Sequence, residues 1–250
     1  MYGQTNQAAG YLRRQYAIVL RRCGVINSLP YWATLGTFCA LLAGPAAAEI
    51  VTDGRSATQL IRSGAVTDIR TGTISNGTGI NSFSRFNVLS GELANLFVPD
   101  SASALVNIVR DQTTTINGMV NAYKDGRIGG NVFFASPNGF VVGQSGVINV
   151  GHLTVSTPTG EFSDRLLDSN GRSEQAALQQ LLDGGAIPLS SSGLIAIRGS
   201  VNALEGVRLT GSQVQIDAQA HIVTIQAVTK MPQLHQSFLK RHRGAAFATA

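Results

Sequence analysis

The sequence predicts an all-β fold of the β-solenoid type, in which short strands form coils and each coil stacks on the next. Its apolar runs are rich in β-branched and aromatic residues and are too short for helices; examples are Val132–Phe134, Phe140–Val142 and Val147–Val155. Polar turns rich in Gly, Pro and Asn separate these runs. With three runs to a coil, the spacing predicts about 20 residues per coil.

Residues 1–48 have the features of a secretory signal peptide. Arginines form a basic N-terminal region, and Leu29–Ala43 supplies the apolar segment. Ala46 and Ala48 form a small-residue cleavage site that leaves Glu49 as the first residue of the mature chain. A single membrane anchor is the alternative, but the apolar segment is short for a span of about 20 residues.

Charge and cysteine content narrow the classes of function. Four of the 19 basic residues lie in the leader, which has no acidic residue, so the mature chain has 15 basic and 14 acidic residues. A nucleic-acid partner is not expected, because phosphate binding requires a basic face. Cys23 and Cys39 both lie in the leader, so the mature chain is expected to lack disulfides. Residues 230–250 are expected to form a flexible basic tail, because they are basic at first and then small and polar.

Taken in order, the mature chain begins with short strands over residues 49–80, which are expected to cap one end of the solenoid. Ser103–Arg110 fits a helix or a strand, and its Val and Ile content favours a strand. Ile116–Ala122 alternates between apolar and polar residues. It leads into Lys124-Asp125-Gly126, which predicts a hairpin or coil turn.

The strand pattern is interrupted over about residues 162–185, where apolar residues recur at helical spacing. We expect one helix at Ser173–Asp183, ended by Gly184-Gly185, as an insertion that covers one side of the solenoid. Strands return over Ser191–Thr229.

The turn Ser136-Pro137-Asn138-Gly139 is the strongest local signal in the chain. Proline sets φ for the second position of a turn, and Asn and Gly tolerate the positive φ that can follow. The turn is therefore expected to set the register between the two apolar runs that flank it.

Two blocks of sequence resemble a known family. Asn131–Phe140, followed by Gly146–Gly151, is similar to the NPNG-type segment of the two-partner secretion domain, which opens filamentous haemagglutinins and related large bacterial adhesins. Asn81–Val88, followed by Gly91–Leu96, resembles the upstream block of the same domain. Ser136 departs from the Asn that is usual in the family, although its side chain still offers a hydrogen-bond acceptor.

The resemblance implies a right-handed parallel β-helix of the pectin-lyase-like kind over residues 49–229, with an N-terminal β cap and a helical insertion. It also implies an outer-membrane transporter partner, whose periplasmic domains recognise the chain. The residues that match the motifs form either a folding nucleus or a contact with the transporter, and the sequence leaves both roles open: Asn131, Ser136, Pro137, Asn138, Gly139, Asn81, Phe83 and Phe86.

No catalytic constellation appears in the sequence. The mature chain has no zinc-ligand pattern and no cysteine, so we expect neither a metal nor another cofactor. His152, on an expected strand, is assigned a structural role. Asp100, Asp111 and Asp125 would be candidates if carboxylates were paired on one face of the solenoid, but each also fits an ordinary turn. Most asparagines are expected to bond adjacent coils.

We therefore expect a secreted adhesin module without enzymatic activity, which reaches the cell surface or medium through the Sec system and the outer membrane. A host or cell-surface ligand is its second expected partner. Two alternatives stay open at this stage. One is a β-helix enzyme that acts on carbohydrates. The other is a truncated relic of a larger adhesin, because about 200 residues remain after the leader.

Overall fold

The computed structural model describes residues 49–224, 228–229 and 248–249. They belong to one compact unit, Ala47–Ala250. The expected signal peptide lies outside the described residues, and so does most of the expected basic tail. Among the described residues, none of the helices is long and apolar enough to cross a membrane.

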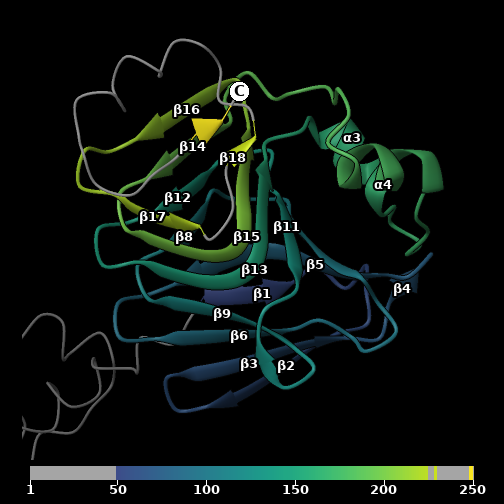
Figure 1. The fold of residues 1–250 in the computed structure, drawn as a ribbon. Helices are drawn as coiled ribbons and strands as arrows, with labels where there is room; N and C mark the ends of the chain where they lie inside the picture. Colours follow the sequence, from purple (N-terminus) through teal and green to yellow (C-terminus); the bar gives the residue numbers. More distant parts are fainter. Residues whose placement is uncertain (1–48, 225–227, 230–247, 250) are drawn as a thin grey trace, which may run out of the picture. The chain divides into compact units, whose positions relative to one another are not determined.

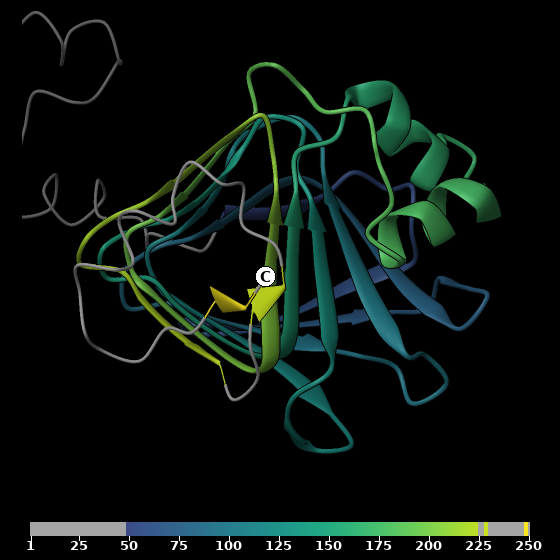
Figure 2. The same ribbon diagram turned by 45° about the horizontal axis from the view of Figure 1, so that its top comes forward.

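Parallel strands stack in register on three faces of a coil, which confirms the predicted solenoid (Figures 1 and 2). Each strand adds to the column above it, so backbone hydrogen bonds run along the axis of the stack. Face 1 contains the first part of β5 (Thr78–Val88), β7 (Ala104–Val109), β11 (Asn131–Ala135), and the second parts of β13 (Val147–Ser156) and β15 (Ser200–Thr210).

Faces 2 and 3 complete each coil. Face 2 contains the end of β5, β8 (Thr114–Ile116), β12 (Phe140–Val142), β14 (Leu194–Ile197) and β16 (Gln213–Ile216). Face 3 contains β3 (Val66–Thr71), β6 (Leu93–Phe97), β9 (Met119–Lys124), the first parts of β13 and β15, and β17 (His221–Thr224).

Antiparallel strands cover the N-terminal end of the stack. The strand β1 (Glu49–Thr52) pairs with β5, β2 (Thr58–Ser63) forms a hairpin with β3, and β4 (Ile74–Ser75) pairs with β5. A further hairpin joins β9 to β10 (Arg127–Ile128) at the predicted Asp-Gly turn. Asp125 and Gly126 have φ values of 52° and 74° there, as hairpin turns of the mirror-image type require.

The predicted coil length is wrong for most of the stack. Met119 lies opposite Leu93, and Val147 lies opposite Met119, so these coils advance by 26 and 28 residues. Three steps come close to the prediction. Asn131 to His152 on face 1 and Ser200 to His221 on face 3 advance by 21 residues, and Leu194 to Gln213 on face 2 advances by 19. The longer coils arise because loops, the β9–β10 hairpin and the helical insertion add residues between strands of ordinary length.

Two apolar cores hold the solenoid together. The inner core lies between the three faces and contains four fully buried phenylalanines, Phe83, Phe86, Phe134 and Phe140. The second core lies on the outer side of face 1, beneath the helical insertion, where Phe162 and Leu178 pack on strand residues such as Val106 and Phe133. The insertion therefore covers one side of the solenoid, as predicted (Figure 2).

The insertion contains two helices, so the expectation of a single helix is wrong. The predicted helix at Ser173–Asp183 corresponds to α4 (Gln175–Leu182). A shorter helix, α3 (Gly160–Leu166), precedes it and is capped by Thr159, whose hydroxyl accepts a hydrogen bond from the Phe162 amide. Seven residues with few apolar positions gave too weak a periodic pattern for prediction. A separate two-stranded sheet pairs β18 (Val228–Thr229) with β19 (Ala248–Thr249).

Candidate functional site

The turn Ser136–Gly139 joins β11 on face 1 to β12 on face 2, at a corner of the coil. The Gly139 amide donates to the Ser136 carbonyl over 3.0 Å, which closes a β-turn. Gly139 has a φ of 108°, and a Cβ atom there would lie 2.8 Å from the Leu194 carbonyl oxygen of the next coil. Glycine is therefore required both by backbone conformation and by close packing.

Contacts with the preceding coil hold the turn in place. The Thr114 amide donates to the Gly139 carbonyl over 3.0 Å, and the hydroxyls of Thr114 and Ser136 share a hydrogen bond of 2.6 Å. The Thr113 hydroxyl donates to the Asn138 carbonyl over 2.7 Å. The Asn138 side-chain amide in turn donates to the Arg110 carbonyl over 2.6 Å. The turn is thus bonded to the coil through both its backbone and its side chains.

Asn138 also lines a shallow, polar groove of about 580 Å³ on the outer surface of this corner. Its lining combines amides, hydroxyls and one carboxylate: Asn87, Asp111, Gln112, Thr113, Thr115, Asn138 and Ser192. Amides and hydroxyls both donate and accept hydrogen bonds, and the carboxylate accepts them, as a polar or extended peptide partner would require. The Asn87 amide reaches the Glu49 carboxylate over 3.4 Å, so the start of β1 lies close to the groove.

Most of the motif residues predicted from the sequence are buried. Ser136, Phe83, Phe86 and Asn81 have no exposed surface. Pro137 and Gly139 are also buried, whereas Asn138 is exposed and Asn131 is half-buried. Asn131 begins β11 while Asn138 follows its end, so the two lie at opposite ends of face 1. The Asn131 amide donates to the Ser103 carbonyl over 3.3 Å.

A chain of aromatic rings joins the two blocks of sequence in the inner core. Phe83 and Phe86 come from the first block, and Phe134 and Phe140 come from the second. Ring centroids are 5.1 Å apart for Phe83–Phe86, 5.4 Å for Phe86–Phe134 and 5.1 Å for Phe134–Phe140. The two blocks therefore pack together in the inner core, and Asn87 and Asn138 from the same two blocks also line the groove.

Asparagines link successive coils at two places. Inside the core, the Asn81 amide donates to Asn107 over 3.0 Å, and the Asn107 amide donates to the Phe133 carbonyl over 3.2 Å. On the outer side of face 3, side chains in register form a ladder that runs from coil to coil: Asp68, Asn95, Asn121, Asn149 and Asn202. These bonds fit the structural role expected for most asparagines.

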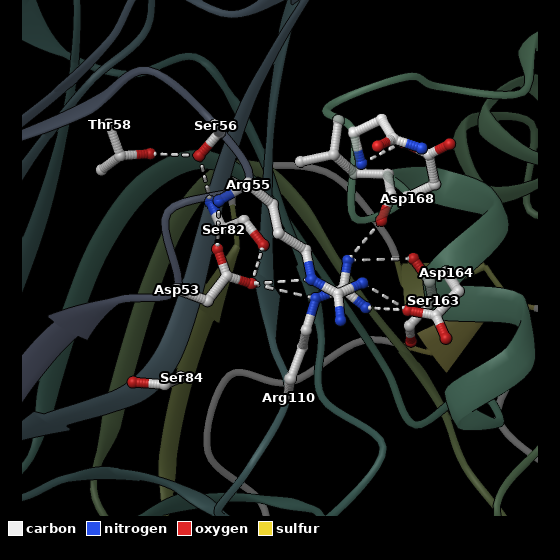
Figure 3. Close-up of polar contacts among 12 residues, drawn as sticks. Asp53, Arg55, Ser56, Thr58, Ser82, Ser84, Arg110, Ser163, Asp164 and Asp168 are labelled. Carbon is white, nitrogen blue, oxygen red and sulfur yellow. Dashed lines mark hydrogen bonds and ion pairs between the residues drawn. The ribbon is translucent and has the colours of Figure 1, made fainter.

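Sequence reasoning missed a polar junction beside the groove, centred on Arg110 (Figure 3). The Arg110 guanidinium lies between Asp53 of the N-terminal cap and Asp164 of α3, at 3.0 Å and 2.9 Å from their carboxylate oxygens. Arg55 also donates to Asp164, over 2.6 Å, and the Ser82 hydroxyl donates to Asp53 over 2.5 Å. No local pattern could reveal the junction, because Arg110 is 57 residues from Asp53 and 54 from Asp164.

The pKa of Arg110 reflects both its burial and its charged neighbours. Burial lowers this pKa below the ordinary value, and the nearby charge of Arg55 lowers it further. The carboxylates of Asp53 and Asp164 oppose both effects. A buried arginine of this kind depends on its partners, because losing one leaves charge without compensation.

The three carboxylates considered for catalysis do not share one site. Asp111 lines the groove described above, whereas Asp100 and Asp125 border a second hollow of about 430 Å³ beside Phe97 and Tyr123. The part of the chain that the structure describes holds no cluster of three or more His, Cys, Asp or Glu side chains that could bind a metal. His152 lies on β13, and burial lowers the pKa of its imidazole, with Arg208 adding to this and Glu205 opposing it.

Comparison with known proteins gives one family. A search of curated proteins found no match. The TPS secretion domain family matches residues 48–239, which include the cap, the solenoid and the helical insertion. The chain therefore belongs to the family of TPS (two-partner secretion) secretion domains, which occur in proteins exported through the outer membrane by a partner transporter.

Proposed function

We propose that this protein is a filamentous haemagglutinin-like adhesin module, and that periplasmic domains of its outer-membrane transporter bind the groove around Asn138. One observation carries the proposal: Asn138 is exposed and lines a polar groove, while its motif neighbours Ser136, Pro137 and Gly139 are buried. A folded partner can only contact what lies at the surface. The motif thus divides into a contact residue and residues that support folding.

The buried members of the motif fit the folding role. Phe86 packs on both Phe83 and Phe134, so the first block stabilises the second. Ser136 and Gly139 hold the corner through hydrogen bonds to neighbouring coils. Changes at these positions should act on secretion through stability.

The export route completes the proposal. Residues 1–48 direct the chain to the Sec system, and cleavage after Ala48 leaves Glu49 at the start of β1. The transporter then carries the chain to the cell surface or the medium, where it binds a host or cell-surface ligand. The adhesin role is supported by the resemblance of the two sequence blocks to those of filamentous haemagglutinins.

The variant Asn138→Ala tests the contact. The full chain is produced together with its transporter, and both the secreted yield and the melting temperature of the purified protein are measured. We expect secretion to fall severalfold, while stability falls by only about 1 kcal/mol through the lost bond to the Arg110 carbonyl. Asn170→Ala is the matched control, because Asn170 is an exposed asparagine in the helical insertion and outside the groove. Equal secretion of the two variants would refute a direct contact at Asn138.

A further inference from the structure

Arg110 follows the last residue of β7 and precedes the residues that form one wall of the groove around Asn138. Its amide donates to the Phe83 carbonyl over 3.0 Å, and its carbonyl accepts the Asn138 side-chain amide at 2.6 Å. The next three residues, Asp111, Gln112 and Thr113, all line the groove. The backbone of Arg110 therefore anchors both Asn138 and one wall of the groove.

The side chain of Arg110 reaches a different part of the molecule, the start of the helical insertion. Besides the carboxylates of Asp53 and Asp164, it donates to the carbonyls of Ser163 and Leu167, at 3.3 Å and 2.6 Å. These two carbonyls belong to the last turn of α3 and its C-cap, the end of a helix that interacts favourably with a cation. The side chain is only 10% exposed.

The position of Arg110 depends on α3 being docked. Asp164, Ser163 and Leu167 all come from α3 and its cap, and they supply three of the four acceptors of the guanidinium. Without them, Asp53 would be the one remaining partner of a largely buried cation, which is an unfavourable arrangement. A shift of this side chain would also displace the Arg110 backbone, which bonds Asn138 and Phe83 at the start of the groove wall.

We propose that Arg110 is a positioning residue that couples the groove around Asn138 to the docking of α3 and the N-terminal cap; this rests on the function proposed above for the groove. Arg110 need not touch the transporter. It acts through its carbonyl bond to Asn138 and through the placement of residues 111–113. The groove then takes its binding shape only when segments near residues 53, 110 and 164 have come together.

Asp164 offers the cleanest test, because it bonds Arg110 from the insertion and lies outside the groove. Residues 47–250 form a compact unit of their own, so the mature chain from Glu49 to Ala250 is used. Its binding to the purified periplasmic domains of the transporter is measured by biolayer interferometry, and melting temperatures are recorded beside it. Asp164→Asn removes the ion pairs to Arg110 and Arg55. Arg165→Gln is the control, since it removes an exposed ion pair to Glu174 in the same insertion.

We expect Asp164→Asn to weaken binding by about fivefold or more, as coupled sites do, while Arg165→Gln binds like the original protein. Asp164→Glu, which keeps the carboxylate, should restore most of the affinity. Arg110→Lys should also weaken binding, because an ammonium cannot reproduce the four directed bonds of the guanidinium. In an Asn138→Ala background, Asp164→Asn should have little further effect, because both changes act on one contact.

The outcomes separate this inference from the function on which it rests. If Asn138→Ala weakens binding but Asp164→Asn and Arg110→Lys do not, the groove binds the transporter and the coupling through Arg110 is wrong. Additive losses in the double variant, or a failure of Asp164→Glu to restore affinity, would also reject the coupling. If Asn138→Ala binds normally, the proposed function of the groove itself fails.

Discussion

At the scale of single residues, the motif turn contains positions with opposite environments. Ser136 and Asn138 are two residues apart, yet one is fully buried against Thr114 and the other faces the groove. Both are small polar residues with turn propensity, so their sequence neighbourhood does not distinguish them. Their environments differ because the neighbouring coil packs against the side of the turn that holds Ser136, while Asn138 lies on the other side.

Gly139 allows a sharp test of the turn. Gly139→Val should destabilise the protein by about 1–3 kcal/mol, because a residue with a side chain is strained at a φ of 108° and its Cβ would press on the Leu194 carbonyl. Urea unfolding measures the loss. Gly129→Ala is the control, since that glycine has no positive φ and a Cβ there would meet nothing within 4 Å. If Gly139→Val is as stable as Gly129→Ala, a side chain at position 139 does not strain the turn.

At the scale of elements, strand register is set by contacts between coils. The ladder from Asp68 to Asn202 repeats one hydrogen bond on the outer side of face 3, so a slip of one residue would break it. The same slip would turn the apolar residues of those strands, such as Val120 and Ile148, out of the inner core. Polar and apolar patterns thus specify the same register.

The helical insertion depends on a second set of apolar contacts. Leu178 of α4 is 2% exposed and lies in the core beneath the helices, so Leu178→Ala should cost about 2–5 kcal/mol for the packing lost there. Faster hydrogen exchange in α4 and a lower melting temperature would report this. Gln175→Ala, on the exposed side of the same helix, should leave both unchanged. Similar behaviour of the two variants would contradict docking of α4 on face 1.

At the scale of the whole molecule, the two blocks of motif sequence act as one packed unit. Phe86 contacts the ring of Phe83 in its own block and that of Phe134 in the other. The inner core therefore closes only when segments about 50 residues apart in the chain have met. Such non-local contacts are formed at an entropic cost that long-range packing must offset.

Phe86→Ala should disrupt this unit. The loss of a fully buried ring between two others should cost about 3–5 kcal/mol and reduce secretion in proportion to the lost stability. Denaturant unfolding and secreted yield are measured together. Phe97→Ala serves as control, because Phe97 lies half-buried on the outer side of face 3 and should matter less. If Phe86→Ala secretes normally despite its lower stability, folding of the two blocks does not limit export.

The sequence by itself determined the features that depend on neighbouring residues. Strands such as β11 and β12 follow from β-branched and aromatic runs, and the corner between them follows from Pro137 and Gly139. The helix α4 follows from its periodic leucines. These elements were predictable because local propensity and the burial of one face specify the same structure.

Only the tertiary structure decided what depends on distant segments. The coil length was not predictable, because loops of unequal length can connect strands that stack in register. The exposure of Asn138 and the burial of Ser136 depend on the neighbouring coil. The partners of Arg110 come from segments more than 50 residues away in both directions, and they meet only because the cap, the coil and α3 pack around it. The hydrogen bonds of the buried Arg110 guanidinium depend on this packing. No periodic pattern in the sequence predicts them.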